Sequence, residues 1–205
     1  MRFISEIESK FEAWLNRSKP YPTILRRVSQ RNIQMPGHVV EGVTGVPEYV
    51  AELREAVERA TPILQRMTEE QSRRQPKPGK WCPREIIGHL IDSASNNHQR
   101  FVRAQFKEDL EFDGYEQDAW VALQQYREAP WNELIDLWRN FNLHIARVMQ
   151  SAPKDERLRK RARHNLDQLA WKPIPRNEPA TLDYFMSDYV AHLKHHLTQI
   201  GIKDS

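Results

Sequence analysis

Three histidines in two separated segments are the residues of this chain best suited to chemistry. His89 lies in KWCPREIIGHLIDSASNN, whereas His192 and His196 lie in DYVAHLKHHLTQI near the C-terminus. Neutral imidazoles are common ligands of divalent ions, and catalytic zinc sites keep one coordination position open. If the two segments pack side by side, the three rings can hold one ion. The sequence therefore predicts a metal site formed by these three histidines.

The second ligand on the C-terminal segment has an alternative. His195 lies about 100° around the helix from His196 and competes with it as the partner of His192, because residues three apart also share a face. We favour the pair 192 and 196, since Phe185 and Tyr189 precede them on one stripe that faces the core. A histidine pair alone, or a single core histidine, is more often structural, so only the joint pattern indicates a metal.

Polar residues continue from His89 along one face of its segment. Asp92, Asn96 and Arg100 follow it at helical spacing between apolar flanks, which is typical of a lined pocket. These three are our candidate catalytic residues, either orienting the metal ligands or contacting the substrate. Asp188, one turn before the C-terminal pair, is a further candidate for orienting a ligand.

Four helices are expected to position these side chains. Pro62 should bend or break the first of them, and Pro83 with Glu85 gives the second a strong start signal. No β-alternation is sustained enough to predict a sheet, and no repeat is present. The sequence therefore predicts an all-α protein, a four-helix bundle. The helices are expected over residues 48–73, 83–107, 131–151 and 178–201.

The positions of the histidines along their helices predict the direction of the helices. His89 lies about six residues from the start of the second helix, whereas His192 and His196 lie near the end of the fourth. The three rings reach one level only if these two helices are antiparallel. A link of about nine residues should make the first two helices antiparallel neighbours, and links of about 25 residues leave the third free. We therefore expect up-down-down-up topology with long crossover connections.

Composition and charge exclude several classes of protein. The chain has 205 residues, a single cysteine, Cys82, and no run approaching the ~20 apolar residues of a membrane span. Residues 1–20 carry no apolar core of a secretory signal, so we expect a cytoplasmic protein. Residues 48–205 should form one domain, preceded by residues 1–47 as an N-terminal extension, a weakly structured or helical arm.

Nucleic acid is an unlikely partner although the chain is basic. Residues 1–47 hold seven basic and four acidic residues and account for the whole net charge of +3. A local cluster over residues 154–164 holds six basic residues and two acidic ones, without the aromatic residues of a single-strand-binding surface. We interpret this cluster as a solvated connection, with a patch for an anionic ligand as the alternative.

Three segments together resemble the DinB/YfiT-like superfamily of metal-dependent proteins: KW-x-PREIIGHLIDS, YEQDAWVALQQY and YVAHLKHHLTQI. The resemblance covers about residues 48–203 and implies a four-helix bundle of up-down-down-up topology. It also implies metal ligation by His89, His192 and His196, with His195 as the histidine that does not bind. Cys82 stands where the family usually has Ser or Thr, and residues 1–47 match nothing expected of the family.

Three neutral ligands leave a bound ion its full double charge, which predicts activation of a nucleophile. The first hypothesis is a metal-dependent enzyme acting on a small molecule, either a hydrolase or a low-molecular-weight-thiol S-transferase, as the resemblance implies. The ion would be zinc, nickel, manganese or iron. Arg100 or the basic residues 157–163 could hold a substrate carboxylate, which would favour the transferase.

Two hypotheses from other classes stay open. The protein could be a non-catalytic helical binding or dimerisation module with a structural metal, and we expect a homodimer in either case. Nucleic-acid binding through the basic arm, residues 1–47, is the third and least favoured.

Overall fold

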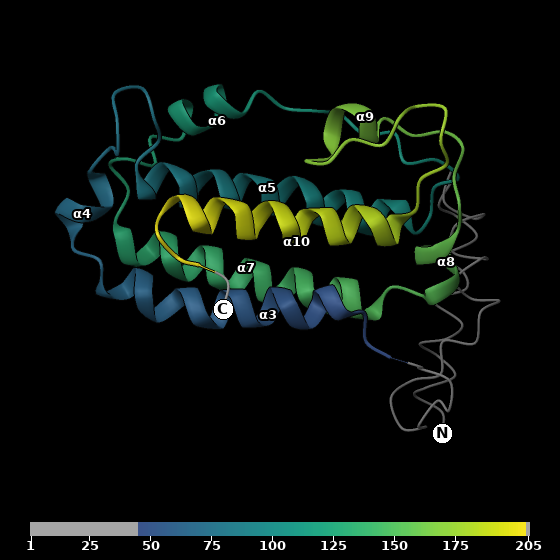
Figure 1. Ribbon diagram of the computed structural model, residues 1–205, viewed down its shortest axis with the longest axis horizontal. Coiled ribbons are helices and arrows are strands. Elements are labelled where there is room, and N and C mark those ends of the chain that lie inside the picture. Colours follow the sequence, from purple (N-terminus) through teal and green to yellow (C-terminus); the bar gives the residue numbers. More distant parts are fainter. Residues whose placement is uncertain (1–44, 204–205) are drawn as a thin grey trace, which may run out of the picture. The chain divides into compact units, whose positions relative to one another are not determined.

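The structure is a computed structural model that describes residues 45–203. Four long helices form its main body. The expected extension over residues 1–47 therefore lies, apart from its last three residues, outside the described part of the chain. Within that part no strand forms, and the prediction of an all-α four-helix bundle is confirmed (Figure 1). The long helices are α3 (Glu48–Arg66), α5 (Pro83–Ala104), α7 (Trp131–Ser151) and α10 (Leu182–Gln199).

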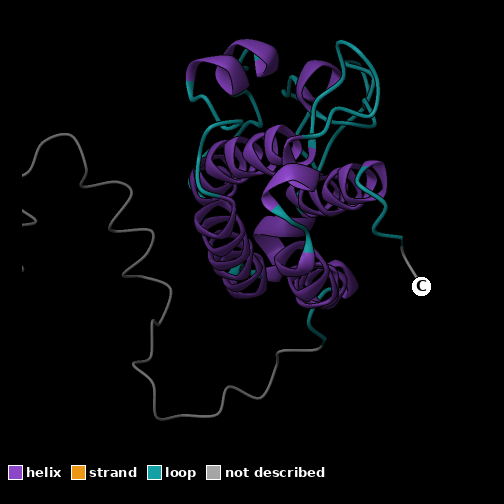
Figure 2. Cartoon of the chain, turned by 90° about the vertical axis from the view of Figure 1, so that its left-hand side faces the viewer, coloured by secondary structure: helices purple, strands orange, loops and turns teal. Residues whose placement is uncertain are grey.

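The four helices follow the predicted up-down-down-up order. In Figure 1, α5 and α7 run in one direction while α3 and α10 run in the other. Each helix contacts two neighbours: α7 packs on α3 and α5, and α10 packs on the same two from the other side. Figure 2 shows the four helices nearly end-on around a common core. Because α5 and α10 are antiparallel, residues near the start of α5 come level with residues near the end of α10.

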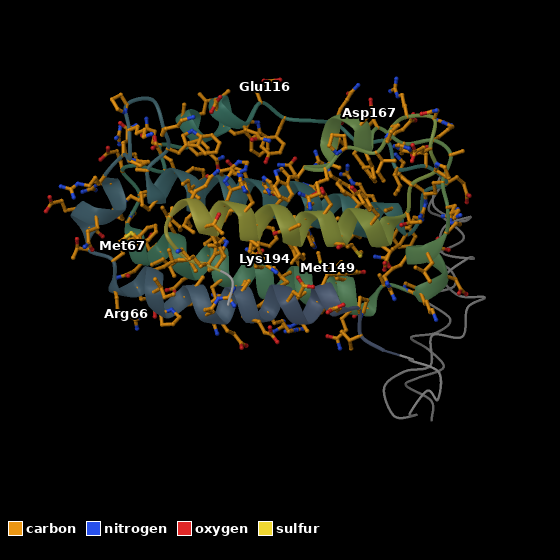
Figure 3. All side chains as sticks on the ribbon, in the orientation of Figure 1. Arg66, Met67, Glu116, Met149, Asp167 and Lys194 are labelled. Carbon is orange, nitrogen blue, oxygen red and sulfur yellow. The ribbon has the colours of Figure 1, made fainter. Side chains whose placement is uncertain are left out.

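Two short helices cover the bundle over α5. They are α6 (Gln117–Leu123) and α9 (Leu166–Leu169), and each lies in one of the long connections (Figure 1). Glu116, which precedes α6, and Asp167 of α9 mark these two segments in Figure 3. The remaining short helices, α4 (Glu69–Arg73) and α8 (Lys154–Leu158), lie at opposite ends of the bundle. The crossovers thus build a layer over the helix that carries His89.

The helix predicted over residues 48–73 is divided into two helices, α3 and α4. Pro62 lies inside α3 and does not end it, and the break falls instead between Arg66 and Glu69. Thr68 causes this break, because its hydroxyl accepts the backbone N–H of Gln71 at 3.2 Å and the Gln71 side chain accepts that of Thr68 at 2.8 Å. This reciprocal capping box starts a new helix.

The expectation that the first two long helices are neighbours was wrong. Helices α3 and α5 are antiparallel but sit at opposite corners of the bundle, with α7 and α10 between them. The physical reason is the length of the link, since α3 ends at Arg66 and α5 begins only at Pro83. A link of that length, with α4 inside it, can cross the end of the bundle.

The core is formed by the apolar faces of the four long helices. Leu53, Ile87, Trp138 and Leu193, one from each of these helices, are completely buried. Burial of such side chains contributes about 1.5–3 kcal/mol each, which gives the long helices most of their stability. With their apolar residues turned inward, none of the described helices has the length and apolar character needed to cross a bilayer.

The basic cluster 154–164 is less solvated than we expected. Arg161 is 2 % exposed and donates to the backbone oxygens of Ala104 at 3.0 Å and Glu156 at 3.0 Å. Arg157 is also buried and pairs with Asp183 at the start of α10. These guanidinium groups satisfy helix-end carbonyls and a carboxylate, so they tie the second crossover to the bundle. The cluster is therefore chiefly structural.

Candidate metal site

The three predicted histidines come together between α5 and α10. The Nε2 atom of His192 lies 3.4 Å from that of His89 and 3.0 Å from that of His196. One ring nitrogen of each residue lies within 4.8 Å of the others, a spacing at which the three can hold one metal ion. The predicted convergence of His89 with the two C-terminal histidines is thus present in the structure.

Burial keeps these rings neutral. His89 is completely buried, and this desolvation, aided by nearby His196, lowers its pKa from 6.5 to about 3. Desolvation also lowers the pKa of His192 to about 2, with further contributions from His196, His89 and His195. The pKa of His196 is lowered by burial as well. The rings therefore carry free lone pairs at neutral pH, as metal ligation requires.

The three ring nitrogens are better suited to binding a cation than to hydrogen-bonding with one another. Three ring nitrogens face one another, and hydrogen bonds within such a group must share few protons among many lone pairs. Here Nε2 of His192 lies within hydrogen-bond distance of two other Nε2 atoms, those of His89 and His196. A metal ion at the centre would give all three inward nitrogens one common partner and offset the cost of burying them.

Gln199 fixes the orientation of one ring and was missed in the sequence. Its Oε1 lies 3.0 Å from Nδ1 of His196, an arrangement that places the proton on Nδ1 and leaves the lone pair of Nε2 free. Its amide nitrogen lies 3.1 Å from Nε2 of His195. The signal available in the sequence was the spacing of three residues between His196 and Gln199, which places both on one helix face.

His195 lies outside the cluster. Its ring stacks on Trp171, with the ring centroids 5.0 Å apart and the planes at 29°. The side chain is exposed, whereas its neighbour His196 turns toward His89, with ring centroids 4.7 Å apart. The geometry therefore supports the choice of residue 196 over residue 195.

Trp81 forms a wall beside the histidines. Its ring centroid lies 4.9 Å from that of His89 and 6.4 Å from that of His196. Together with Gln199 it also lines a pocket of about 560 Å³, which Lys80 and Asp118 border. A small molecule in this pocket would lie against residues that contact the histidine cluster, with an aromatic ring on one side and polar groups on the other.

Asp92 binds the covering layer rather than a histidine. Its Oδ1 accepts from the hydroxyl of Tyr126 at 2.7 Å and from the amide of Gln124 at 2.6 Å. Its Oδ2 is buried and has no hydrogen bond to any described residue. Desolvation raises the pKa of Asp92, although the bonds from Tyr126 and Gln124 oppose the shift. This carboxylate holds the segment after α6 against α5.

Of the other candidates, Arg100 and Asp188 bond to connecting segments, and Asn96 bonds within its own helix. Asn96 donates to the backbone oxygen of Asp92 at 2.9 Å, and Arg100 donates to that of Asp113 at 2.7 Å. Asp188 accepts the backbone N–H groups of Trp171 at 2.8 Å and of the next residue at 2.9 Å. Within the described part of the chain none of these candidates hydrogen-bonds to the cluster, so the orienting contact belongs to Gln199 instead.

Cys82 is the N-cap residue of α5, and its thiol is not placed to react. Its backbone N–H donates to Oε2 of Glu85 at 2.7 Å, as the start signal predicted. The thiol is completely buried, and desolvation raises its pKa. A group held in its thiol form is a poor nucleophile.

This architecture, with three histidines shared by two antiparallel helices, defines a class of helical-bundle proteins. A family model for the DinB superfamily matches residues 52–200, and the chain belongs to this superfamily. Among solved structures it is similar to YfiT from Bacillus subtilis, at 20 % identity and a TM-score of 0.63, over 80 % of this chain and 89 % of that one. YfiT is described as a probable metal-dependent hydrolase with an unusual four-helix bundle topology. No curated protein matches the chain.

The metal-free protein is expected to lose stability as the pH falls. The pKa of His89 is about 3 in the folded chain and near 6.5 when unfolded, so below pH 6.5 the unfolded state binds the extra proton. At pH 5 this single group should lower the free energy of unfolding by about 2 kcal/mol. Urea unfolding at pH 7.5 and 5.0 measures the effect, and His89→Gln should remove that share of it. The matched variant His195→Gln, which alters an exposed ring, should keep the wild-type pH dependence. Equal pH dependence in wild type and His89→Gln would contradict the burial argument.

Proposed function

We propose that this protein is a metal-dependent enzyme whose ion is bound by His89, His192 and His196. The observation that carries the proposal is the convergence of three neutral, desolvated imidazole nitrogens on one point. Imidazole ligands suit zinc, nickel and iron, and manganese is a further possibility. A bound ion would supply Lewis acidity that lowers the pKa of a coordinated water or thiol.

The surrounding residues would prepare this site for a small-molecule substrate. Gln199 holds the proton of His196 on Nδ1, so the opposite nitrogen stays available to the ion. Trp81 covers one side of the cluster and limits the access of bulk water. Its ring also offers a flat apolar surface to a substrate in the adjoining pocket.

Two reactions fit this chemistry, and each has its own support. Hydrolysis is favoured by the similarity of fold to YfiT, which is described as a probable metal-dependent hydrolase. Transfer of a low-molecular-weight thiol to an electrophile is favoured by Arg100, a buried cation that could hold the carboxylate of such a thiol. The competing proposal from another class is a helical binding module in which the ion only stabilises the bundle.

Metal loading followed by turnover assays separates these proposals. We expect the full-length chain to bind about one Zn²⁺, Ni²⁺, Mn²⁺ or Fe²⁺, because one three-ligand cluster is present in the described residues. The loaded protein should hydrolyse 4-nitrophenyl acetate, or join glutathione to 1-chloro-2,4-dinitrobenzene, and a chelator should stop the reaction. An ion that binds at this ratio and raises Tm but supports neither reaction would favour the structural role. A chain that binds none of the four ions would contradict both.

A further inference from the structure

A second pocket lies along α5, beyond the histidine cluster. Its volume is about 530 Å³, and it is enclosed by α5, by the segment around Asp113 and by Asn165 at the start of α9. Asn96, Arg100 and Arg103 of α5 line it. Among the residues that line it, the proposed function gives a role to Arg100 alone.

Arg100 is a buried cation that forms no ion pair with the described residues, although the charge of Asp113 is near enough to act on it. It is 6 % exposed and donates to the backbone oxygen of Asp113 at 2.7 Å and to Oδ1 of Asn97 at 3.4 Å. Both acceptors are neutral, and no carboxylate of the described residues lies within 4.0 Å of its guanidinium group. Buried charges in proteins are normally paired, because desolvating an isolated ion is costly. The pocket wall thus holds a positive charge that an incoming anion could neutralise.

Two other charged residues of the pocket are already neutralised. Lys107 forms an ion pair with Asp109 at 3.0 Å, and Glu111 forms one with Arg163 at 2.7 Å. Both pairs are partly exposed to solvent, and they contribute little net charge to the pocket. The potential inside is therefore set by the residues that remain.

Arg103 adds a second free cation one turn from Arg100. It is exposed, and its guanidinium group has no ion pair or hydrogen bond to a described side chain. Asp113 is the remaining acidic residue in the lining and is exposed as well, with its backbone oxygen turned to Arg100. Two guanidinium groups against one carboxylate leave the pocket positive. Guanidinium groups bind planar carboxylates and phosphates with paired hydrogen bonds.

We propose that this pocket binds the carboxylate or phosphate group of a small-molecule ligand through Arg100 and Arg103. Arg100 lies eleven residues after His89, so the two share a face of α5 and are separated by about 16 Å along it. That separation suits one extended molecule with its acidic end here and its reactive end at the histidines. The identification of this molecule as the substrate rests on the proposed function, whereas anion binding itself does not.

Titration of the full-length protein with inorganic phosphate and with succinate tests the pocket. In ¹⁵N NMR spectra, the Nε–H signals of Arg100 and Arg103 should shift and saturate with one of the two probes, and the tighter probe identifies the preferred group. Arg103→Gln should weaken binding about tenfold, because the exposed Arg103 side chain, which has no hydrogen bond or ion pair to another described residue, loses its charge-assisted hydrogen bond to the anion. Arg147→Gln, an exposed arginine on α7, is the matched control and should leave the affinity unchanged. Absence of saturation with either probe, or equal weakening by both variants, would overturn the proposal.

The same titration of the His89→Ala variant tests anion binding independently of the metal site. We expect this variant to bind phosphate or succinate as wild type does, even if the proposed enzyme activity fails. The link to the substrate is tested by comparing glutathione, which carries carboxylates, with cysteamine, which carries none. Arg103→Gln should raise KM for glutathione about tenfold and leave that for cysteamine unchanged. Equal effects on the two thiols would show that the anion bound here is not part of the substrate.

Discussion

Replacing His89 by alanine is expected to abolish metal binding and to leave the bundle folded. The ring supplies one of three converging nitrogens, and the ion would be left with two ligands from one helix. Losing even an outer partner of a ligand costs 10- to 100-fold in metal affinity, so losing a ligand should cost more than about 100-fold. After dialysis, metal analysis should find about one ion per wild-type chain and almost none in the variant.

The stability of the same variant should change much less than its metal content. Removal of the ring leaves a cavity in the core, but it also removes a buried Nδ1 that has no partner among the described residues. These effects oppose each other, and we expect a cost of about 1–2 kcal/mol in the metal-free protein. Far-UV circular dichroism should therefore remain that of a helical bundle.

His195→Ala is the control for this experiment. It removes a histidine from the same helix, one residue from a ligand, but from a ring that stacks on Trp171 outside the cluster. Metal content should remain near one ion per chain. Full occupancy in His89→Ala, or equal loss in both variants, would refute the assignment of the ligands.

The directions of the helices could be predicted because the rise per residue gives the height of each side chain along the helix axis. A rise of about 1.5 Å per residue placed His89 and the C-terminal pair at one level only in antiparallel helices. The structure confirms that topology, with α5 and α10 running in opposite directions. The bounds of α7, which lacks internal proline and capping signals, were also as predicted.

Contacts between distant segments could not be predicted in the same way. Arg161 is a charged residue in a basic run, and its burial depends on the carbonyl group of Ala104 at the end of α5, which lies more than fifty residues away. The short helices α6 and α9 were missed because one or two turns carry too little periodic signal. These features depend on tertiary contacts, which the spacing of residues within a short segment does not predict.

The site shows the same division between local and distant information. The pair His192 and His196 is visible in the sequence because the two residues are four positions apart and therefore lie on one face of a helix. Trp81 beside His89, by contrast, depends on how the link before α5 folds back. Asp92 was noticed for its spacing, yet its partner Tyr126 comes from the covering layer, which the sequence pattern did not predict.

Gly88→Ala is expected to destabilise the fold by about 3 kcal/mol. A Cβ atom at residue 88 would lie 2.1 Å from Cδ2 and 2.2 Å from Cγ of Tyr126, far inside van der Waals contact. Tyr126 is 6 % exposed, so its ring would have to leave a packed position and give up its hydrogen bond to Asp92. Overpacking and the lost bond outweigh the gain of about 1 kcal/mol from replacing a helical glycine. Thermal and urea unfolding measure the change.

Gly114→Ala provides the matched control, because a Cβ atom there would meet only Cδ2 of Leu169 at an ordinary 3.7 Å. We expect its effect to stay within about 0.5 kcal/mol. Comparable losses in the two variants would mean that Gly88 is not specially constrained by the ring of Tyr126.

A double variant decides whether Tyr126 is the cause. Tyr126→Ala removes the ring atoms that a methyl group at residue 88 would meet at 2.1 and 2.2 Å, and it leaves the Cβ atom of residue 126 at 2.8 Å, a contact that a small shift of the segment must relieve. In that background Gly88→Ala should lose most of its destabilising effect, a coupling of about 1–3 kcal/mol between two residues that touch. Such a reduction would establish that the glycine beside His89 makes room for the ring of Tyr126. An unchanged loss in the double variant would assign the constraint to the helix itself.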